Sequence, residues 1–223
     1  PTRKPRPGPG LRGLRRVGVS VLTGLALVAL AFRVPQMTSL QPSPDNDDAL
    51  ALTVLSAVLD GYSGARLARA LTQGPDRVAD SASAGNGLLG RGPQTFSLVG
   101  VPAAGKTAAQ VEAALREQVA RIAKEGVSEA ELNRVKTQWV ASEVYKRDSV
   151  MGQAQELGHY WIQGLPLDAD AQLIERLRGV TAAQVQAVAQ KYFGDDQLTV
   201  ATLLPQPRDP NARPRVAPLD ARH

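Results

Sequence analysis

The chain has 223 residues and a formal net charge of +5, and 43% of its residues are hydrophobic. This composition is typical of a globular protein and excludes a wholly disordered chain. Because cysteine is absent, disulfide frameworks, thiolate metal sites and cysteine nucleophiles are excluded. Histidine, the commonest metal ligand and general base, occurs only at His159 and His223.

The positive charge is concentrated at the N-terminal end. Residues 1–33 carry seven Lys or Arg and no acid, whereas the rest of the chain is slightly acidic. Such a basic arm either binds nucleic acid or anionic lipid, or is a solvated linker. Its Pro- and Gly-rich composition favours the linker, so we expect no nucleic-acid partner. We predict a linker at residues 1–13, one domain at 14–207 and an extended tail at 208–223.

An apolar run at residues 17–32 has two interpretations. With 16 residues it falls short of the about 20 that a spanning helix needs. It resembles a signal peptide with a cleavage site at residues 29–31. Alternatively it forms two strands, at 16–21 and 25–34, separated at Thr23 and Gly24, and this pattern is the one we favour.

The remaining pattern predicts helices and strands in alternating groups. Polar residues at 43–48 cap a helix that ends near Asp60, and a short helix follows at 65–71. We expect strands at 78–84, 94–101 and 198–204. Further helices are expected at 107–125, at 128–162 with a break near 148–152, at 168–178, and from 181 onward. This order predicts an α+β two-layer sandwich, with a mostly antiparallel sheet of about five or six strands and helices packed on one face.

The sharpest motif is G-V-P-A-A-G-K-T, from Gly100 to Thr107, which matches the phosphate-binding loop pattern G-x-x-x-x-G-K-[ST]. A nucleotide site here would place Lys106 on phosphates and Thr107 on magnesium. The surrounding elements do not alternate as βα units, and no later apolar strand ends in an Asp that could hold magnesium. The favoured alternative is a plain strand-to-helix turn.

Metal and hydrolytic chemistry have little support within the chain. Glu156 and His159 have helical spacing, but a zinc site needs at least a third protein ligand. No G-x-S-x-G motif surrounds any Ser. We therefore predict no catalytic residue, no metal ligand and no cofactor bound by this chain. Trp139, Trp161, Tyr145 and Tyr160 are interpreted as core or interface residues.

Several short segments, taken in order, resemble one domain of pitrilysin/insulinase-type zinc metallopeptidases. The closing half of that domain resembles G-V-S-E-A-E-L at 126–132, R-D-S at 147–149, G-V-T-A-A-Q-V at 179–185, K-Y-F at 191–193 and L-T-V-A-T-L-L-P at 198–205. The opening half resembles R-V-P at 33–35, D-A-L-A-L at 48–52 and L-D-G-Y-S-G-A-R-L at 59–67. The resemblance covers about residues 14–207.

The resemblance implies an accessory role. In that family, homologous domains pair around a chamber for peptides, and an N-terminal domain holds zinc through H-x-x-E-H and a distant Glu. This chain lacks that motif, so it is similar to the C-terminal, non-zinc-binding partner domain. Zinc is then expected in an N-terminal domain or a partner subunit. The alternative is a catalytically inactive homologue that acts as a binding or assembly subunit.

The resemblance also locates substrate-binding positions. C-terminal domains of the family often supply an Arg and a Tyr, and Thr72 and Asp80 stand at those positions here. This departure implies a split arrangement in which a second homologous subunit supplies the pair. Possible interface residues are Arg66, Arg69, Ser81 and Ser83. The family makes a bacterial periplasm the expected compartment, with the cytoplasm as the alternative.

Overall fold

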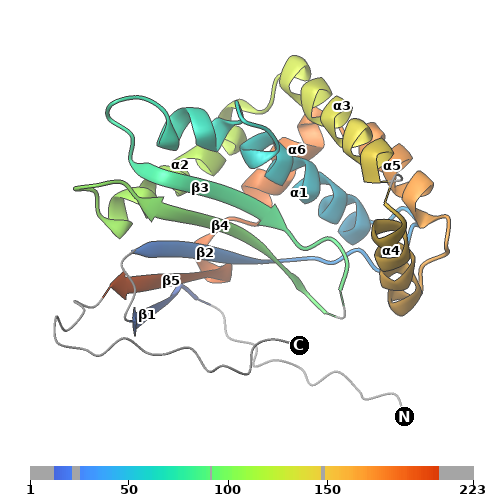
Figure 1. Cartoon of the computed structure of the whole chain (residues 1–223), viewed down its shortest axis with the longest axis horizontal. Helices are drawn as coiled ribbons and strands as arrows, with labels where there is room; N and C mark the ends of the chain where they lie inside the picture. Colours follow the sequence, from blue (N-terminus) through green and yellow to red (C-terminus); the bar gives the residue numbers. More distant parts are fainter. Residues whose placement is uncertain (1–12, 22–25, 91, 147–148, 206–223) are drawn as a thin grey trace, which may run out of the picture.

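The structure, a computed structural model, describes residues 13–21, 26–90, 92–146 and 149–205. A single sheet forms one layer and the helices form the other (Figure 1). The strands are β1 (Arg15–Val21), β2 (Leu27–Val34), β3 (Ala79–Asn86), β4 (Gln94–Pro102) and β5 (Leu198–Pro205). The helices are α1 (Pro44–Asp60), a π-helical turn η1 (Ala68–Thr72), α2 (Ala108–Glu125), α3 (Glu129–Lys146), α4 (Val150–Gln163), α5 (Ala169–Gly179), α6 (Ala182–Lys191) and a 3-10 turn η2 (Asp195–Gln197).

The strand order is β1-β5-β2-β4-β3. Of the strand pairs in the described residues, β1–β5 is parallel and the others are antiparallel. The α+β sandwich with a mostly antiparallel sheet is therefore confirmed. The two strands predicted within residues 16–34 are also present, as β1 and β2, and the predicted break in the long helix separates α3 from α4. Nearly all of the predicted linker and the whole tail at 208–223 lie outside the described residues.

The sheet buries one face against the helices. Along β2, Val28, Leu30 and Phe32 are fully buried, while the alternate side chains are more exposed. Phe32 and its cross-strand neighbour Phe96 both contact Phe193, with ring centroids 4.8 and 4.9 Å away. The core therefore lies between the sheet and the helical layer.

Helix α1 is the centre of the helical layer. It packs against β3, α3, α5 and α6, and its first turn is capped by Ser43, whose hydroxyl accepts from the Asn46 backbone N–H. Its buried residues are Asn46, Ala49, Leu50, Ala51, Leu52, Val54, Leu55, Val58 and Leu59. The prediction of a helix that is capped at residues 43–48 and ends near Asp60 is confirmed.

Asn46 is a buried polar residue, 2% exposed, that ties the β2–α1 connection to α1. Its Oδ1 accepts from the backbone N–H of Thr38 at 3.0 Å, and its Nδ2 donates to Gln41 O at 2.8 Å and to Ser39 Oγ at 3.2 Å. Because a buried amide without partners is costly, these bonds fix the path of residues 38–43.

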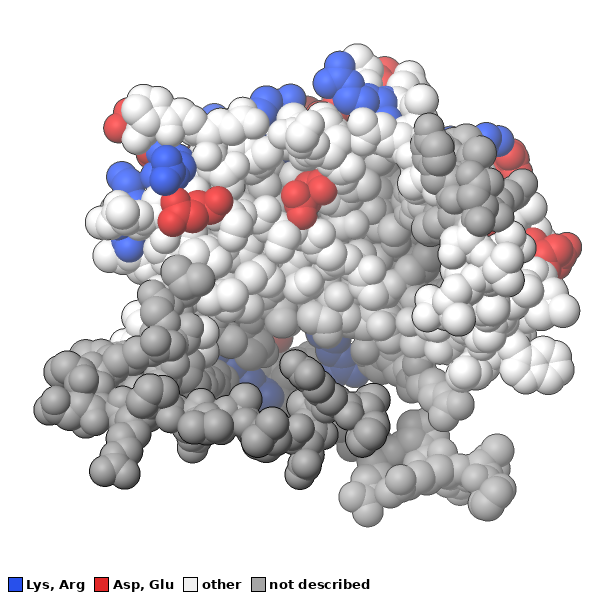
Figure 2. Space-filling view, viewed as in Figure 1, with Lys and Arg blue, Asp and Glu red and all other residues white. Residues whose placement is uncertain are grey.

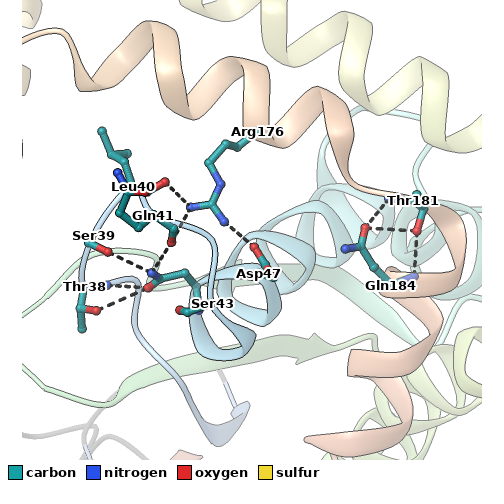
Figure 3. A network of polar contacts seen from close by, with 10 residues as sticks. Thr38, Ser39, Leu40, Gln41, Ser43, Asp47, Arg176, Thr181 and Gln184 are labelled. Carbon is teal, nitrogen blue, oxygen red and sulfur yellow. Dashed lines mark hydrogen bonds and ion pairs between the residues drawn. The ribbon is translucent and has the colours of Figure 1, made fainter.

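Arg176 of α5 joins the same region. Its guanidinium donates to Leu40 O at 2.9 Å and forms an ion pair with Asp47 in the first turn of α1 (Figure 3). The β2–α1 connection, α1 and α5 are thereby held together by polar contacts at one end of α1.

The edge strand β3 is covered by α1. Ala82 and Ala84 of β3 face the helical layer, and their small side chains permit the helix to approach closely. The backbone N–H of Ala84 donates to Asp60 Oδ2 at 3.2 Å, and Asn86 Nδ2 donates to Ala49 O at 3.2 Å. One outward N–H of the sheet edge is thus satisfied by the last residue of α1.

No helix in the described part of the chain is both long enough and apolar enough to cross a membrane.

We expect Asn46→Ala to lower the free energy of unfolding by about 2–3 kcal/mol, because it removes three hydrogen bonds made by a buried side chain. Urea denaturation of the domain measures this. Asn133→Ala, at an exposed position of α3, is the matched control and is expected to change stability by less than about 0.5 kcal/mol. Equal effects of the two substitutions would contradict the role given to Asn46.

Asp60 gives a pH-dependent prediction. Its burial raises the pKa of the carboxyl group, against the opposing hydrogen bond from Ala84. A raised folded pKa means that the charged form is disfavoured in the folded state. Stability therefore falls as pH rises from the unfolded pKa, about 3.9, through the folded pKa.

We expect Asp60→Asn to keep an acceptor for Ala84 and to raise stability at pH 7 by about 0.5–1 kcal/mol, since it also removes a negative charge from a helix C-terminus. The gain should vanish below about pH 3.9. Thermal unfolding from pH 3 to 8, with the exposed Asp76→Asn as control, tests this; a gain that does not depend on pH would refute it.

Candidate interface surfaces

Arg66 and Arg69 lie on the turn that follows α1, and both point to Glu131 of α3. Arg66 Nε and Nη2 donate to the two carboxylate oxygens of Glu131 at 2.9 and 2.7 Å, and Nη2 also donates to Gly126 O at 3.2 Å. Arg69 Nη2 lies 3.9 Å from Glu131 Oε1. The hydrogen bond to Glu131 raises the pKa of Arg66, while burial opposes it.

These contacts distinguish the two arginines. The Arg66 side chain is 17% exposed and joins the segment just before η1 to α3, whereas that of Arg69 is 53% exposed. Ser128 Oγ accepts from the Glu131 backbone N–H and so caps the start of α3, but the Glu131 carboxylate binds Arg66. Arg69 is therefore the member of the pair with side-chain surface available to another molecule.

Thr72 and Asp80, at the positions expected from the resemblance to correspond to the family's Arg and Tyr, make local contacts. Thr72 Oγ1 donates to Ala68 O at 3.0 Å within η1. Asp80 forms an ion pair with Arg77 at 3.0 Å, and both side chains are about half exposed. Both side chains are thus engaged with neighbours in their own segments.

Ser81 and Ser83 are exposed and lie on the opposite face of the sheet from Arg66 and Arg69. Because side chains alternate along a strand and Ala82 packs against the core, the two serines point away from the helices. Their cross-strand partners on the neighbouring strand β4 are Val101 and Val99, respectively. The four predicted interface residues are thus divided between two faces of the domain.

The segment from Gly100 to Thr107 is a strand-to-helix turn in which three backbone N–H groups donate to partners inside the protein. Ala103 N–H donates to Val78 O, Lys106 N–H to Ala103 O, and Thr107 N–H to the Gln110 side chain. Thr107 Oγ1 in turn accepts from Gln110 N–H, which completes a capping box at the start of α2.

The strand that leads into this turn also differs from that of a phosphate-binding loop. β4 is antiparallel to both of its neighbours, β2 and β3, whereas such loops follow a strand of a parallel sheet. Gly100 is required for packing, because a Cβ there would lie 2.5 Å from Val111 Cγ1 of α2. The glycine is thus explained by the close approach of α2 to β4.

Glu156 and His159 lie on α4. Glu156 Oε1 accepts from the Tyr160 hydroxyl at 2.9 Å, and His159 is exposed. Across the described residues, no group of three or more His, Cys, Asp or Glu side chains is arranged to hold a metal ion.

The exposed apolar face of α4 was not predicted as a surface, although Trp161 was interpreted as a core or interface residue. Six large hydrophobic residues between positions 150 and 167 are exposed, and Trp161 is 74% exposed. In Figure 2, the surface at the lower right, where α4 lies in Figure 1, is mostly uncharged. Val150, Leu157 and Trp161 are separated by seven and four residues, which correspond to about two turns and one turn of a helix. This spacing is the sequence signal for a shared apolar face on α4.

The fold is shared with domains of known proteases. A protease from Helicobacter pylori superimposes with a TM-score of 0.78 at 22% identity, over 92% of this chain and 48% of that chain. The inactive peptidase domain of a Bordetella parapertussis protein described as a zinc protease gives 0.69 at 18% identity, over 90% and 99%. The periplasmic protease PqqL from Escherichia coli gives 0.62 at 21% identity, over 87% and 21%.

Sequence identities this low establish a shared fold and nothing more. The chain spans about half the length of the Helicobacter pylori protease that it matches. No curated protein sequence matches the chain. A sequence profile described as the peptidase M16 inactive domain matches residues 2–139, which is more than half of the chain. The chain therefore belongs to the family of peptidase M16 inactive domains, which confirms the resemblance to the non-zinc-binding half of pitrilysin-type zinc metallopeptidases.

Proposed function

We propose that this chain is the accessory C-terminal domain of a zinc metallopeptidase and forms part of the peptide chamber and the domain interface. The observation that carries the proposal is the family match to an inactive domain. The H-x-x-E-H motif is absent from the full sequence. Hydrolysis is then performed by a zinc site in an N-terminal domain or a partner subunit.

The face of the sheet opposite the helices is our candidate for the chamber wall. Val17, Ala201, Ala29, Val99 and Ser83 form one row across all five strands on that face. These short side chains leave the sheet backbone close to the surface. A smooth wall of this kind would accept extended peptides with few restrictions on their side chains.

Partner and compartment follow from the same proposal. The Helicobacter pylori chain is about twice as long as the segment that matches, which leaves room there for a second domain of similar size. A second homologous subunit would supply the Arg and Tyr that are replaced here by Thr72 and Asp80, with Arg69 as its proposed contact, while Ser81 and Ser83 lie on the face proposed as the chamber wall. The periplasmic location of the Escherichia coli relative supports a bacterial periplasm.

We expect zinc binding and peptide cleavage to require a zinc-bearing counterpart. The counterpart is the domain with an H-x-x-E-H motif encoded upstream in the same gene or in a neighbouring gene. Metal analysis and cleavage of a mixed fluorogenic peptide library are measured for each domain alone and for the mixture. Activity that appears or rises at least about tenfold on mixing supports the accessory role.

Two other results would decide against it. Stoichiometric zinc and cleavage by this chain alone would contradict the proposal. Binding to a counterpart that has no H-x-x-E-H motif, with no cleavage, would favour the catalytically inactive assembly subunit instead.

The nucleotide alternative is tested by Lys106→Ala. Because the N–H groups of Ala103, Lys106 and Thr107 are internally bonded, we expect 1 mM MgATP to leave the melting temperature of the parent and of the variant unchanged. A ligand present at 100 times its Kd would stabilise the fold by about 2.7 kcal/mol, which thermal unfolding detects. A shift seen in the parent and lost in Lys106→Ala would reinstate the nucleotide site.

A further inference from the structure

Exposed large hydrophobic residues are concentrated in two places in the described part of the chain. One group lies on β1 and β5 and in the residue before β1, namely Leu14, Val17, Val19 and Leu204. The other lies on α4 and the loop that follows it, namely Val150, Met151, Leu157, Trp161, Ile162 and Leu167. We call the second group the α4 patch. Contiguous apolar surface of this kind marks an interaction site on a protein.

Helix α4 is specified by its own sequence. Ser149 caps its start by accepting from Gly152 N–H at 3.1 Å. Gly164 ends it in the left-handed conformation at φ 74°, with Gly164 N–H and Leu165 N–H bonded to the last turn. These local signals mark where the helix begins and ends.

The packing of α4 on its own domain is slight. Of its 14 residues, Tyr160 is the buried one, at 6% exposure, and the Tyr160 hydroxyl donates to Glu156 on the same side of the helix. An isolated helix of this length is marginal in water, because most helical stability in proteins comes from packing of an apolar face. The apolar face of α4 is therefore available for packing that this domain does not provide.

That face points outward. Val150, Leu157 and Trp161 are spaced by seven and four residues and form one stripe along the helix, with Met151 and Ile162 beside it. Val150 is 84% exposed and Met151 69% exposed. Figure 1 places α4 at the margin of the helical layer, beside one end of the sheet. A second body can therefore reach this side of α4 without displacing another helix.

We propose that the α4 patch is the docking surface for the zinc-bearing counterpart domain, with Trp161 as its central anchor. This inference rests on the proposed function and adds the surface through which the two domains join. In the Helicobacter pylori protease, more than half of the chain lies outside the matched segment, so a body large enough to cover α4 is present in that relative.

Two other occupants fit the patch less well. A membrane-surface helix carries Lys or Arg on its polar face, whereas residues 149–167 contain neither. A two-fold dimer closed through α4 alone would bury roughly 200 Å² on each copy, from a helix about 21 Å long and about 10 Å wide, against about 800 Å² per partner in stable complexes. A counterpart domain that also contacts the surfaces beside α4 can bury a larger area.

The test compares three proteins: the parent chain, the double variant Trp161→Glu/Ile162→Lys, and Leu204→Glu. Leu204 is an exposed leucine of the other apolar group, at the end of β5 remote from α4. The Bordetella parapertussis relative is a chain of nearly the same extent, so the domain is studied by itself. Circular dichroism and thermal unfolding first establish that all three are folded.

Each protein is then titrated into the zinc-bearing counterpart, with binding followed by calorimetry and cleavage followed with the fluorogenic peptides. We expect the double variant to bind at least about 30-fold more weakly, as loss of a central aromatic anchor does. Cleavage should recover at correspondingly higher concentration of the variant. Leu204→Glu should bind within about twofold of the parent.

The outcomes separate this inference from the proposed function. If the parent itself does not bind the counterpart, the proposed function fails. If the parent and the double variant bind equally, the proposed function stands and the α4 patch is not the docking surface. If the substitutions instead abolish self-association in light scattering, or flotation with vesicles of anionic lipid, while leaving counterpart binding intact, the occupant is a second copy or a membrane and the inference is wrong.

Discussion

The burial of α1 is the constraint on which the rest of the domain depends. A helix with so little polar surface has to be covered on most sides, and β3, α3, α5 and α6 each cover part of it. The polar contacts of Asn46 and Arg176 then determine where its N-terminus lies, because neither side chain could be left unpaired where it is. The apolar side chains of α1 place the helix at the centre of the domain. The hydrogen bonds at its N-terminus set its position along the sheet.

Most helices and strands could be predicted from the sequence because their signals are local. The Ser43 and Thr181 caps, the Gly126 stop and the alternation within β2 and β4 each involve a few neighbouring residues. The strand order could not be predicted in this way, because β1 pairs with a strand more than 180 residues later. The pairing of Arg66 with Glu131 was missed for the same reason, since it joins segments separated by 65 residues.

The motif from Gly100 to Thr107 shows how a sequence pattern can have two physical origins. Position 100 requires a glycine because α2 packs closely against the backbone there, and Thr107 caps α2. A phosphate-binding loop uses the same residue types, but it leaves its N–H groups free and follows a parallel strand. The α4 patch is the opposite case, since its helical spacing was visible in the sequence but the face that it marks could be assigned to the outside only from the structure.

The position of β5 has a consequence for how the domain forms. The last strand of the domain lies between β1 and β2, the first two, with registers such as Val17 to Ala201 and Ala29 to Ala201. During synthesis, β2 therefore has an unsatisfied edge until the ribosome has released almost the whole domain. Such long-range closure is slow, and it leaves a hydrogen-bonding edge of β2 open to other chains. Completion of this sheet is a late and cooperative event. A chain truncated before residue 198 lacks β5, the strand that pairs with both β1 and β2.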